Sequence, residues 1–131
     1  MTAVWVAYLL LAERLVNLAA DPTISQPERE AMLRSAISRA YYAAFILTHN
    51  YLRDQEGDKA ISKLSQVHLY AADKFSGSKN QLRHDIGTKL YRLRRMRNSA
   101  DYDDRFDKLP KDARRAVNEA KLVVGALNSL R

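Results

Sequence analysis

Apolar residues recur along most of the chain at the three- and four-residue intervals of helices, and no segment alternates with the period of a strand. Five stretches show this pattern, at residues 2–20, 25–53, 59–75, 80–98 and 111–130. The connections between them are mostly short, which is typical of an up-and-down helical bundle. We therefore predict an all-α fold of four to five helices, with residues 1–131 forming a single domain.

The first stretch opens with an unbroken apolar run from Ala3 to Ala12. A membrane span needs about 20 such residues, whereas this run stops at Glu13, and no basic leader of a signal peptide precedes it. We expect no membrane partner. The run instead predicts a helix that is buried all round, or buried on one side by another subunit. Its predicted inward stripe is Val4, Tyr8, Leu11, Leu15 and Leu18.

The second stretch is the longest and is predicted to be the central helix. It begins at Ser25, which forms a capping box with Glu28, and Pro27 fits its first turn. One apolar stripe contains Leu33, Ile37, Ala40, Ala44, Leu47 and Tyr51. Another side carries a second, largely aromatic stripe of Arg34, Tyr41, Phe45 and Leu52. Two apolar faces indicate a helix that is covered from both directions.

The third and fifth stretches each present one apolar face to the core. A turn at Gly57-Asp58 leads into the third stretch, whose predicted inward residues are Ile61, Leu64, Val67, Ala71 and Phe75. A polar connector, rich in aspartate, covers residues 101–110 and leads into the fifth stretch. Its predicted inward residues are Ala113, Val117, Ala120, Val124 and Leu127.

The fourth stretch carries a charge in its apolar row. At 100° per residue, an arc of about 80° contains Leu82, Ile86, Leu90, Leu93 and Arg97. Burying a guanidinium is costly unless it is paired and hydrogen-bonded. Arg97 therefore pairs with a carboxylate, faces a partner subunit or opens into a polar cleft. Asp101 is close enough to pair with it if the helix extends, and Tyr102 would add a phenolic donor.

The net charge of +7 and the pI of about 9.8 favour an anionic partner such as RNA. Much of the basic charge lies in the fourth stretch, as Arg83, Lys89, Arg92, Arg94, Arg95 and Arg97. These cations would follow a phosphate backbone, or they form a solvated face that the helix dipole stabilises. The candidate RNA-binding residues are Arg92, Arg94 and Arg95, together with Arg39 of the second stretch.

The residue inventory excludes several kinds of site. The chain has no cysteine, which excludes disulfides, thiolate zinc sites and cysteine nucleophiles and fits a cytoplasmic location. The histidines lie in three different stretches without the spacing of a metal site, and we expect His68 to be a satisfied, partly buried side chain. The connector aspartates are more typical of turns than of a two-metal site. We predict no metal and no cofactor.

Two segments together resemble the HEPN domain family. The first is Arg34-Ser-Ala-Ile-Ser-Arg39-Ala-Tyr41-Tyr42-Ala-Ala-Phe45, and the second is Leu93-Arg-Arg-Met-Arg97-Asn98-Ser-Ala100-Asp101-Tyr102. The resemblance covers most of the chain. It implies a small helical bundle that usually homodimerises, with the motif helices of two subunits building a shared cleft. It also implies a toxin–antitoxin or antiphage setting, with a nucleotidyltransferase or antitoxin as a partner protein.

Active members of that family are metal-independent ribonucleases whose arginine is followed within a few residues by a histidine. No histidine follows Arg97 in this chain, although histidine is the natural acid–base group near neutral pH. We therefore favour a dimeric module that binds RNA, a nucleotide or a partner protein. One alternative is a ribonuclease toxin that uses Arg97, Asn98 and either Asp101 or Tyr102. The other is a purely structural pair of Arg97 and Asp101.

Overall fold

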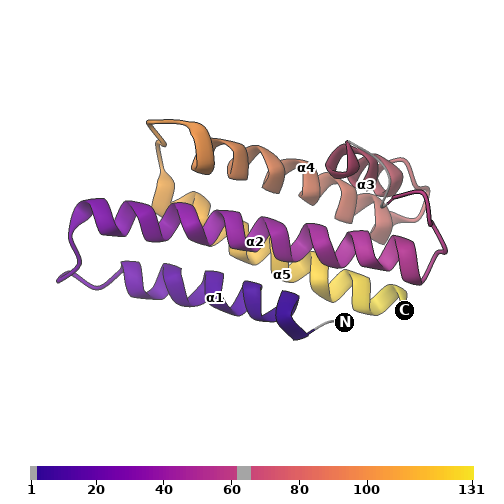
Figure 1. Cartoon of the computed structure of the whole chain (residues 1–131), viewed down its shortest axis with the longest axis horizontal. Helices are drawn as coiled ribbons and strands as arrows, with labels where there is room; N and C mark the ends of the chain where they lie inside the picture. Colours follow the sequence, from indigo (N-terminus) through magenta and orange to yellow (C-terminus); the bar gives the residue numbers. More distant parts are fainter. Residues whose placement is uncertain (1–2, 62–65) are drawn as a thin grey trace.

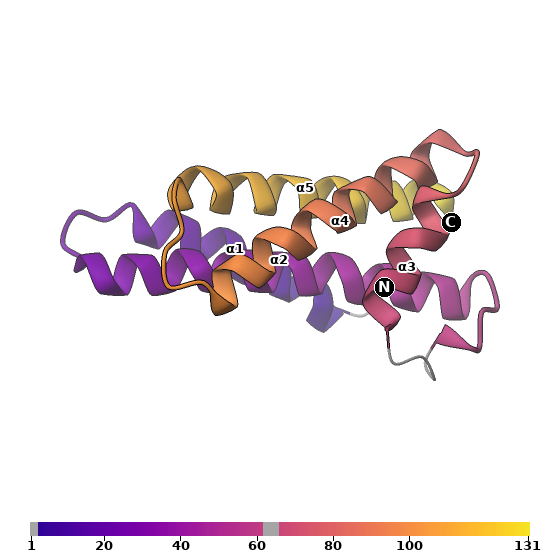
Figure 2. The ribbon, with the colours of Figure 1, turned by 90° about the horizontal axis from the view of Figure 1, so that it is seen from above.

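The computed structural model describes residues 3–61 and 66–131, and over those residues it contains helices and no strand, as predicted (Figure 1). The helices are α1 (Ala3–Ala19), α2 (Gln26–Asp54), α3 (Val67–Ser76), α4 (Gln81–Tyr102) and α5 (Leu109–Leu130). The four long helices run lengthwise, and the short α3 crosses the bundle at one end (Figure 2). The predicted all-α bundle is therefore confirmed.

Helix α2 is central and packs against each of the other four helices (Figure 1). Its N-terminus is capped as predicted, since the backbone N–H of Glu28 donates to the Ser25 hydroxyl at 3.3 Å. Both predicted stripes are buried except for Arg34, which is half-buried. The first stripe contains small alanines, which permit close packing of neighbouring helices. Tyr41 of the aromatic stripe contacts His68 of α3 and Arg97 of α4.

Helix α1 covers the core with one face only. Its fully buried residues are Leu9, Ala12 and Ala19. The predicted inward stripe was wrong for Val4, Leu11 and Leu18, which are exposed. An almost wholly apolar helix has no polar face to mark its solvent side, so periodicity alone could not fix its rotation. Within the described residues, no helix combines the length and the apolar character that a membrane crossing requires.

Helix α3 begins at Val67, later than the predicted start at residue 59. The Tyr70 hydroxyl donates to the carboxylate of Asp58, and a continuous helix would hold residues at that separation about 18 Å apart. Residues 59 and 60 accordingly form a turn, and the predicted helix does not begin there. Leu64, which we predicted to face inward, lies outside the described residues.

The far end of α3 lies close to α4 because residue 87 has no side chain. A Cβ atom on Gly87 would stand 2.3 Å from the backbone nitrogen of Ser76. Of the predicted inward residues of α3, Ala71 and Phe75 are buried. This close approach holds α3 against the bundle at the end where it crosses.

Helix α4 extends to Tyr102, a full turn beyond its predicted end, so Asp101 is a helical residue. The row of Ile86, Leu90, Leu93 and Arg97 is buried as predicted, while Leu82 is 36% exposed. The short connector ends at Lys108, whose φ of 60° turns the chain into α5. On α5, Val124, which we predicted to face inward, is only half-buried, while its neighbour Val123 is buried.

Candidate functional site

The C-terminal end of α4 is held in place by Arg34 of α2. Its guanidinium donates to four backbone carbonyls, those of Ser99 (3.3 Å), Ala100 (2.9 Å), Asp103 (2.6 Å) and Asp104 (3.1 Å). These carbonyls lie at and just beyond the end of the helix, where intrahelical donors run out. A positive charge there also complements the negative end of the helix dipole. Arg34 thereby fixes the segment that carries Arg97.

Arg97 is buried near that end, with 8% of its surface exposed. Its guanidinium carbon lies 5.2 Å from the ring centroid of Tyr41 and 5.4 Å from that of Tyr42, both on α2. The Oδ2 atom of Asp101 is 3.9 Å from Nη1 of Arg97. Nε of Arg97 is buried and has no hydrogen-bond partner among the described residues. The predicted inward arginine is confirmed, and its carboxylate contact is a single long one.

The other three predicted catalytic residues differ in their relation to Arg97. Asp101 provides the long contact, and its side chain is 30% exposed. Tyr102 is 76% exposed, and over the described ranges no hydrogen bond or ion pair connects it to Arg97. Asn98 is half-buried and follows Arg97 directly on the helix. The structure thus brings Asp101 to Arg97 and leaves the Tyr102 ring in solvent.

A histidine that the sequence did not connect with this region lies on the same aromatic rings. Nδ1 of His68, on α3, is hydrogen-bonded to the Tyr41 hydroxyl. Its ring is stacked on Phe45 with centroids 4.1 Å apart, and it meets Tyr42 edge-on with centroids 6.2 Å apart. Arg97 and His68 therefore both contact Tyr41 and Tyr42. The only hint in the sequence was the aromatic stripe of α2, which needed a covering element.

The surroundings of His68 keep it uncharged at neutral pH. Burial lowers the pKa of His68 below its ordinary value of 6.5, and the positive charges of Arg97 and Arg94 lower it further. Burial also raises the pKa of Tyr41 far above that of a free phenol, although the Arg97 charge opposes this. Tyr41 therefore remains a neutral phenol, and His68 remains a neutral imidazole.

The four predicted RNA-binding arginines have different surroundings. Arg94 and Arg95, with Tyr91, line a hollow of about 310 Å³ on α4, and Nε of Arg94 is buried without a hydrogen-bond partner in the described part of the chain. Arg92 instead packs on α5, where Nε donates to the buried Glu119 at 2.9 Å. Arg39 lies over the ring of Tyr8 on α1, 5.5 Å from its centroid. Of these four arginines, Arg94 and Arg95 are the nearest to Arg97 along α4.

The connector aspartates do not converge on a common point. Asp103 and Asp104 present their carbonyls to Arg34, and Asp107 pairs with Arg105 at 3.1 Å. Within residues 3–61 and 66–131, no three His, Cys, Asp or Glu side chains are grouped so as to hold a metal ion. The connector aspartates therefore contribute backbone carbonyls and one surface ion pair rather than a shared carboxylate site.

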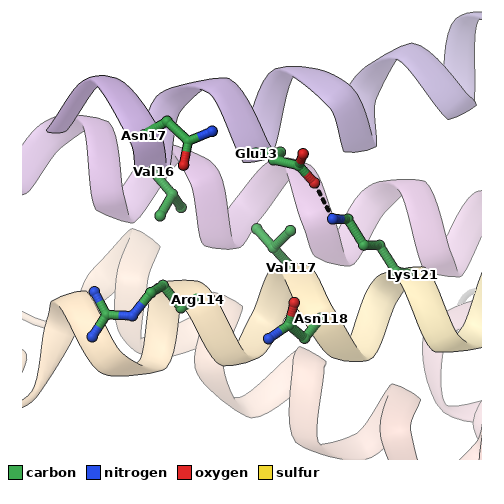
Figure 3. A pocket seen from close by; sticks show the side chains of 7 residues that line it. All are labelled: Glu13, Val16, Asn17, Arg114, Val117, Asn118 and Lys121. Atoms are coloured by element: carbon green, nitrogen blue, oxygen red, sulfur yellow. Dashed lines mark ion pairs between the residues drawn. The ribbon is translucent and has the colours of Figure 1, made fainter. Parts of the chain in front are cut away.

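A separate cavity of about 220 Å³ lies between α1 and α5 (Figure 3). Lys121 is ion-paired with Glu13 across its mouth, and Arg114 and Asn118 line the same side as Lys121 (Figure 3). The paired charges neutralise each other, and no buried polar atom of this cavity lacks a partner among the described residues. The unpaired buried nitrogens belong to α4, so the candidate site is the Arg94–Arg97 region.

The comparisons with known proteins identify one family for most of the chain. The model of one family, described as the HEPN domain, matches residues 26–130, which include all of α2, α4 and α5. No curated protein and no solved structure matches the chain. The match begins at the start of α2, so α1 lies outside it.

Proposed function

The chain belongs to the HEPN domain family, and we propose that it binds RNA along α4, with one backbone phosphate held at Arg94 and Arg97 and a further phosphate contact at the exposed Arg95. The observation that carries this proposal is the state of Arg97. The residue is 8% exposed, its Nε has no hydrogen-bond partner among the described residues, and it has a single carboxylate contact at 3.9 Å. A buried charge with so few internal partners is costly. A phosphate that accepts charge-assisted hydrogen bonds from the guanidinium would offset that cost.

The neighbouring cations support a phosphate as the ligand. Guanidinium groups bind phosphate through paired, charge-assisted hydrogen bonds. Among the described residues neither Arg94 nor Arg95 forms an ion pair, in contrast to Arg92, and the two border the hollow that contains Tyr91. Tyr91 is half-buried, and an aromatic ring at the edge of a basic hollow is suited to stacking with a base of a single-stranded RNA.

Fluorescence anisotropy with a labelled single-stranded RNA tests this proposal. We expect Arg95→Gln to weaken binding by about 3- to 10-fold and to lower the salt dependence of the affinity by about one unit of slope. Arg114→Gln on α5 is the matched control, because Arg114 is exposed and lies away from α4. Equal losses in the two variants would indicate nonspecific attraction and would contradict the proposal, as would the absence of RNA binding by the native chain.

We also propose that the chain forms a homodimer through the exposed stripe of α1. Val4, Leu11 and Leu18 are 43–56% exposed and are spaced symmetrically about Leu11. Two antiparallel copies of α1 would therefore place Val4 opposite Leu18 and Leu11 opposite its own copy, which is an isologous interface. Because α1 does not contact α4, this pairing leaves the Arg97 region open to RNA.

Analytical ultracentrifugation tests the dimer. Leu11→Glu should give a monomer, whereas Leu82→Glu, an exposed position on α4, should leave the dimer intact. A native chain that sediments as a monomer at micromolar concentration would rule the interface out.

The proposed setting is a cytoplasmic toxin–antitoxin or defence system, with a nucleotidyltransferase or antitoxin as the further partner. Co-purification with the product of a neighbouring gene would test that part.

A second candidate function is RNA cleavage, and the position of His68 favours it. The motif segment itself offers poor proton-transfer groups, since Tyr102 is exposed and Asp101 is at the edge of the site. A carboxylate or a phenol would need a strongly shifted pKa to act near neutral pH. A neutral imidazole on the rings beside Arg97 would need no such shift.

A further inference from the structure

We propose that the phosphate held at Arg94 and Arg97 is the terminal one of the strand, so that the chain recognises a phosphate monoester at an RNA end. This inference rests on the proposed function, because it requires RNA along α4 with a phosphate at these two arginines. It adds the chemical class of that phosphate. A terminal monoester and an internal diester differ in their free oxygens, in their charge and in the space that they need.

The first observation is that two guanidiniums with unused donors lie close together on one helix. Arg94 and Arg97 are three residues apart on α4, a spacing that places their Cβ atoms about 5–6 Å apart. Nε of each is buried and has no hydrogen-bond partner in the described part of the chain. A guanidinium bonds a phosphate most strongly through two parallel N–H groups. A monoester offers three free oxygens to such groups, and an internal diester offers one fewer.

The second observation is that the chain neutralises little of the positive charge at these guanidiniums. Among the described residues, only Asp101 forms an ion pair with either arginine, at 3.9 Å, and its side chain is 30% exposed. Burial lowers the pKa of His68, and the charges of Arg97 and Arg94 lower it further. An internal diester carries a single negative charge, whereas a monoester carries about −1.5 to −2 near pH 7. The monoester therefore offsets more of the buried positive charge.

The third observation is that the space at these arginines is small. The hollow beside Arg94 measures about 310 Å³, which is at the lower end of the range of about 300–1,000 Å³ for small-ligand sites. Arg97 is only 8% exposed, so a phosphate that reaches it has little room for a ribose on each of its sides. A terminal phosphate carries a ribose on one side only. The hollow therefore suits the last nucleotide of a strand better than an internal one.

The residues around the hollow fit a strand that ends there. Tyr91 lines the hollow and is half-buried, so its ring is suited to stacking with the terminal base. Arg95 lines the same hollow and is exposed, where it would contact the next phosphate of any RNA. Arg92 is instead paired with the buried Glu119 at 2.9 Å. The strand would thus leave the hollow past Arg95.

The first experiment compares RNAs that differ only at one end. Fluorescence anisotropy of the full chain uses an internally labelled single-stranded RNA whose 5′ end is a hydroxyl, a monophosphate or a methyl phosphate, and a matching set is modified at the 3′ end. We expect the monophosphate at one of the two ends to tighten binding by about 10-fold or more over the hydroxyl. The methyl phosphate places a diester at the same position and should gain no more than about threefold.

The outcomes separate this inference from the proposed function. Equal affinity for all of these RNAs overturns the recognition of a terminal monoester and leaves RNA binding along α4 standing. The same is true if the methyl phosphate binds as tightly as the monophosphate. The absence of any RNA binding overturns both.

The second experiment compares Arg94→Gln with Arg95→Gln as its matched control. Arg94→Gln should bring the ratio of the monophosphate and hydroxyl affinities close to one. Arg95→Gln should weaken both RNAs by the same factor and keep the ratio. Circular dichroism checks that each variant is folded, and Arg94→Lys, which keeps the charge without the planar fork, should retain only part of the preference. A native ratio in both Arg94 variants would overturn the proposal.

The third experiment varies the salt concentration. Because buried charges are screened much less than exposed ones, the affinity ratio should stay constant between about 50 and 200 mM salt while both affinities fall steeply. A preference that disappears at the higher salt concentration would indicate attraction to the exposed cations and would overturn the assignment to Arg94 and Arg97.

Discussion

Arg34 and Arg97 are two guanidiniums at the same end of the bundle with opposite surroundings. The Arg34 side chain is 18% exposed, donates to four backbone carbonyls and pairs with Glu30 at 3.2 Å. The Arg97 side chain is more deeply buried, at 10% exposure, and has one carboxylate contact at 3.9 Å. The difference shows which arginine the fold uses internally and which it leaves with bonding capacity for a ligand.

The energetic consequences of the two environments also differ. Each hydrogen bond from a charged donor is worth about 1.5–3 kcal/mol, so Arg34 stabilises the end of α4 substantially. Arg97 loses hydration and gains mainly contacts with the faces of Tyr41 and Tyr42, which are worth about 0.5–2 kcal/mol each. Arg34 is therefore expected to govern stability, and Arg97 is expected to govern binding.

The largest predicted effect is on stability, from Arg34→Met. This change removes the donors to the carbonyls that end α4 and should lower the free energy of unfolding by about 3–5 kcal/mol. Urea denaturation followed by circular dichroism measures it. Arg114→Met on α5 is the control and should change the same quantity by less than about 0.5 kcal/mol. A loss below 1 kcal/mol for Arg34→Met would remove the distinction between the two arginines.

Arg97→Met should have the opposite effect, with little change in stability and a clear loss of RNA affinity. Replacing a poorly paired buried charge with an apolar side chain of similar volume is often neutral or stabilising, so we expect the free energy of unfolding to stay within about 1 kcal/mol of the native value. RNA affinity should fall by about 10-fold or more. Parallel losses of stability and affinity would instead favour a structural Arg97–Asp101 pair.

Asp101→Asn sharpens the comparison with a smaller change. The carboxylate is partly exposed and 3.9 Å from Arg97, so its loss should cost less than about 0.5 kcal/mol of stability. The freed charge of Arg97 should raise RNA affinity by about two- to threefold. Anisotropy titrations alongside a urea melt measure both. A drop in affinity would mean that Asp101 contacts the RNA rather than competing with it.

The smallest predicted effect is a pH dependence of stability from His68. Because its pKa is lower in the folded chain than the ordinary 6.5, the unfolded chain binds more protons below that pH. Stability is therefore complete above about pH 6.5 and declines as the pH falls through the window down to the folded pKa. The free energy of unfolding of the native chain relative to that of His68→Gln should therefore be lower at about pH 5 than at about pH 7.5. A constant difference would contradict the lowered pKa.

Local pattern was enough to predict most of the helices and the inward position of Arg97. The apolar row of α4 and the cap of α2 depend on residues within a turn or two of each other. The rotation of α1 could not be predicted, because its residues are apolar on nearly every side. The late start of α3 is accompanied by a hydrogen bond between Asp58 and Tyr70, which no periodicity reports.

The candidate site was only partly predictable, because several of its contacts join residues that are far apart in the sequence. Asp101 and Arg97 are neighbours on one helix, and the sequence placed them together. The bond from Tyr41 to His68 spans 27 residues, and those from Arg34 to the end of α4 span 65 to 70. Such contacts depend on how helices pack in three dimensions. They are also the contacts that separate a structural arginine from a binding one.

The most direct test observes the two guanidiniums during RNA binding. In a ¹⁵N-labelled sample the Nε–H signals of Arg34 and Arg97 can be assigned by substitution and followed as single-stranded RNA is added. The account predicts that the Arg97 signal shifts progressively to saturation while the Arg34 signal stays in place. An Arg97 signal that does not move while RNA binds would contradict the claim that this buried arginine serves a ligand.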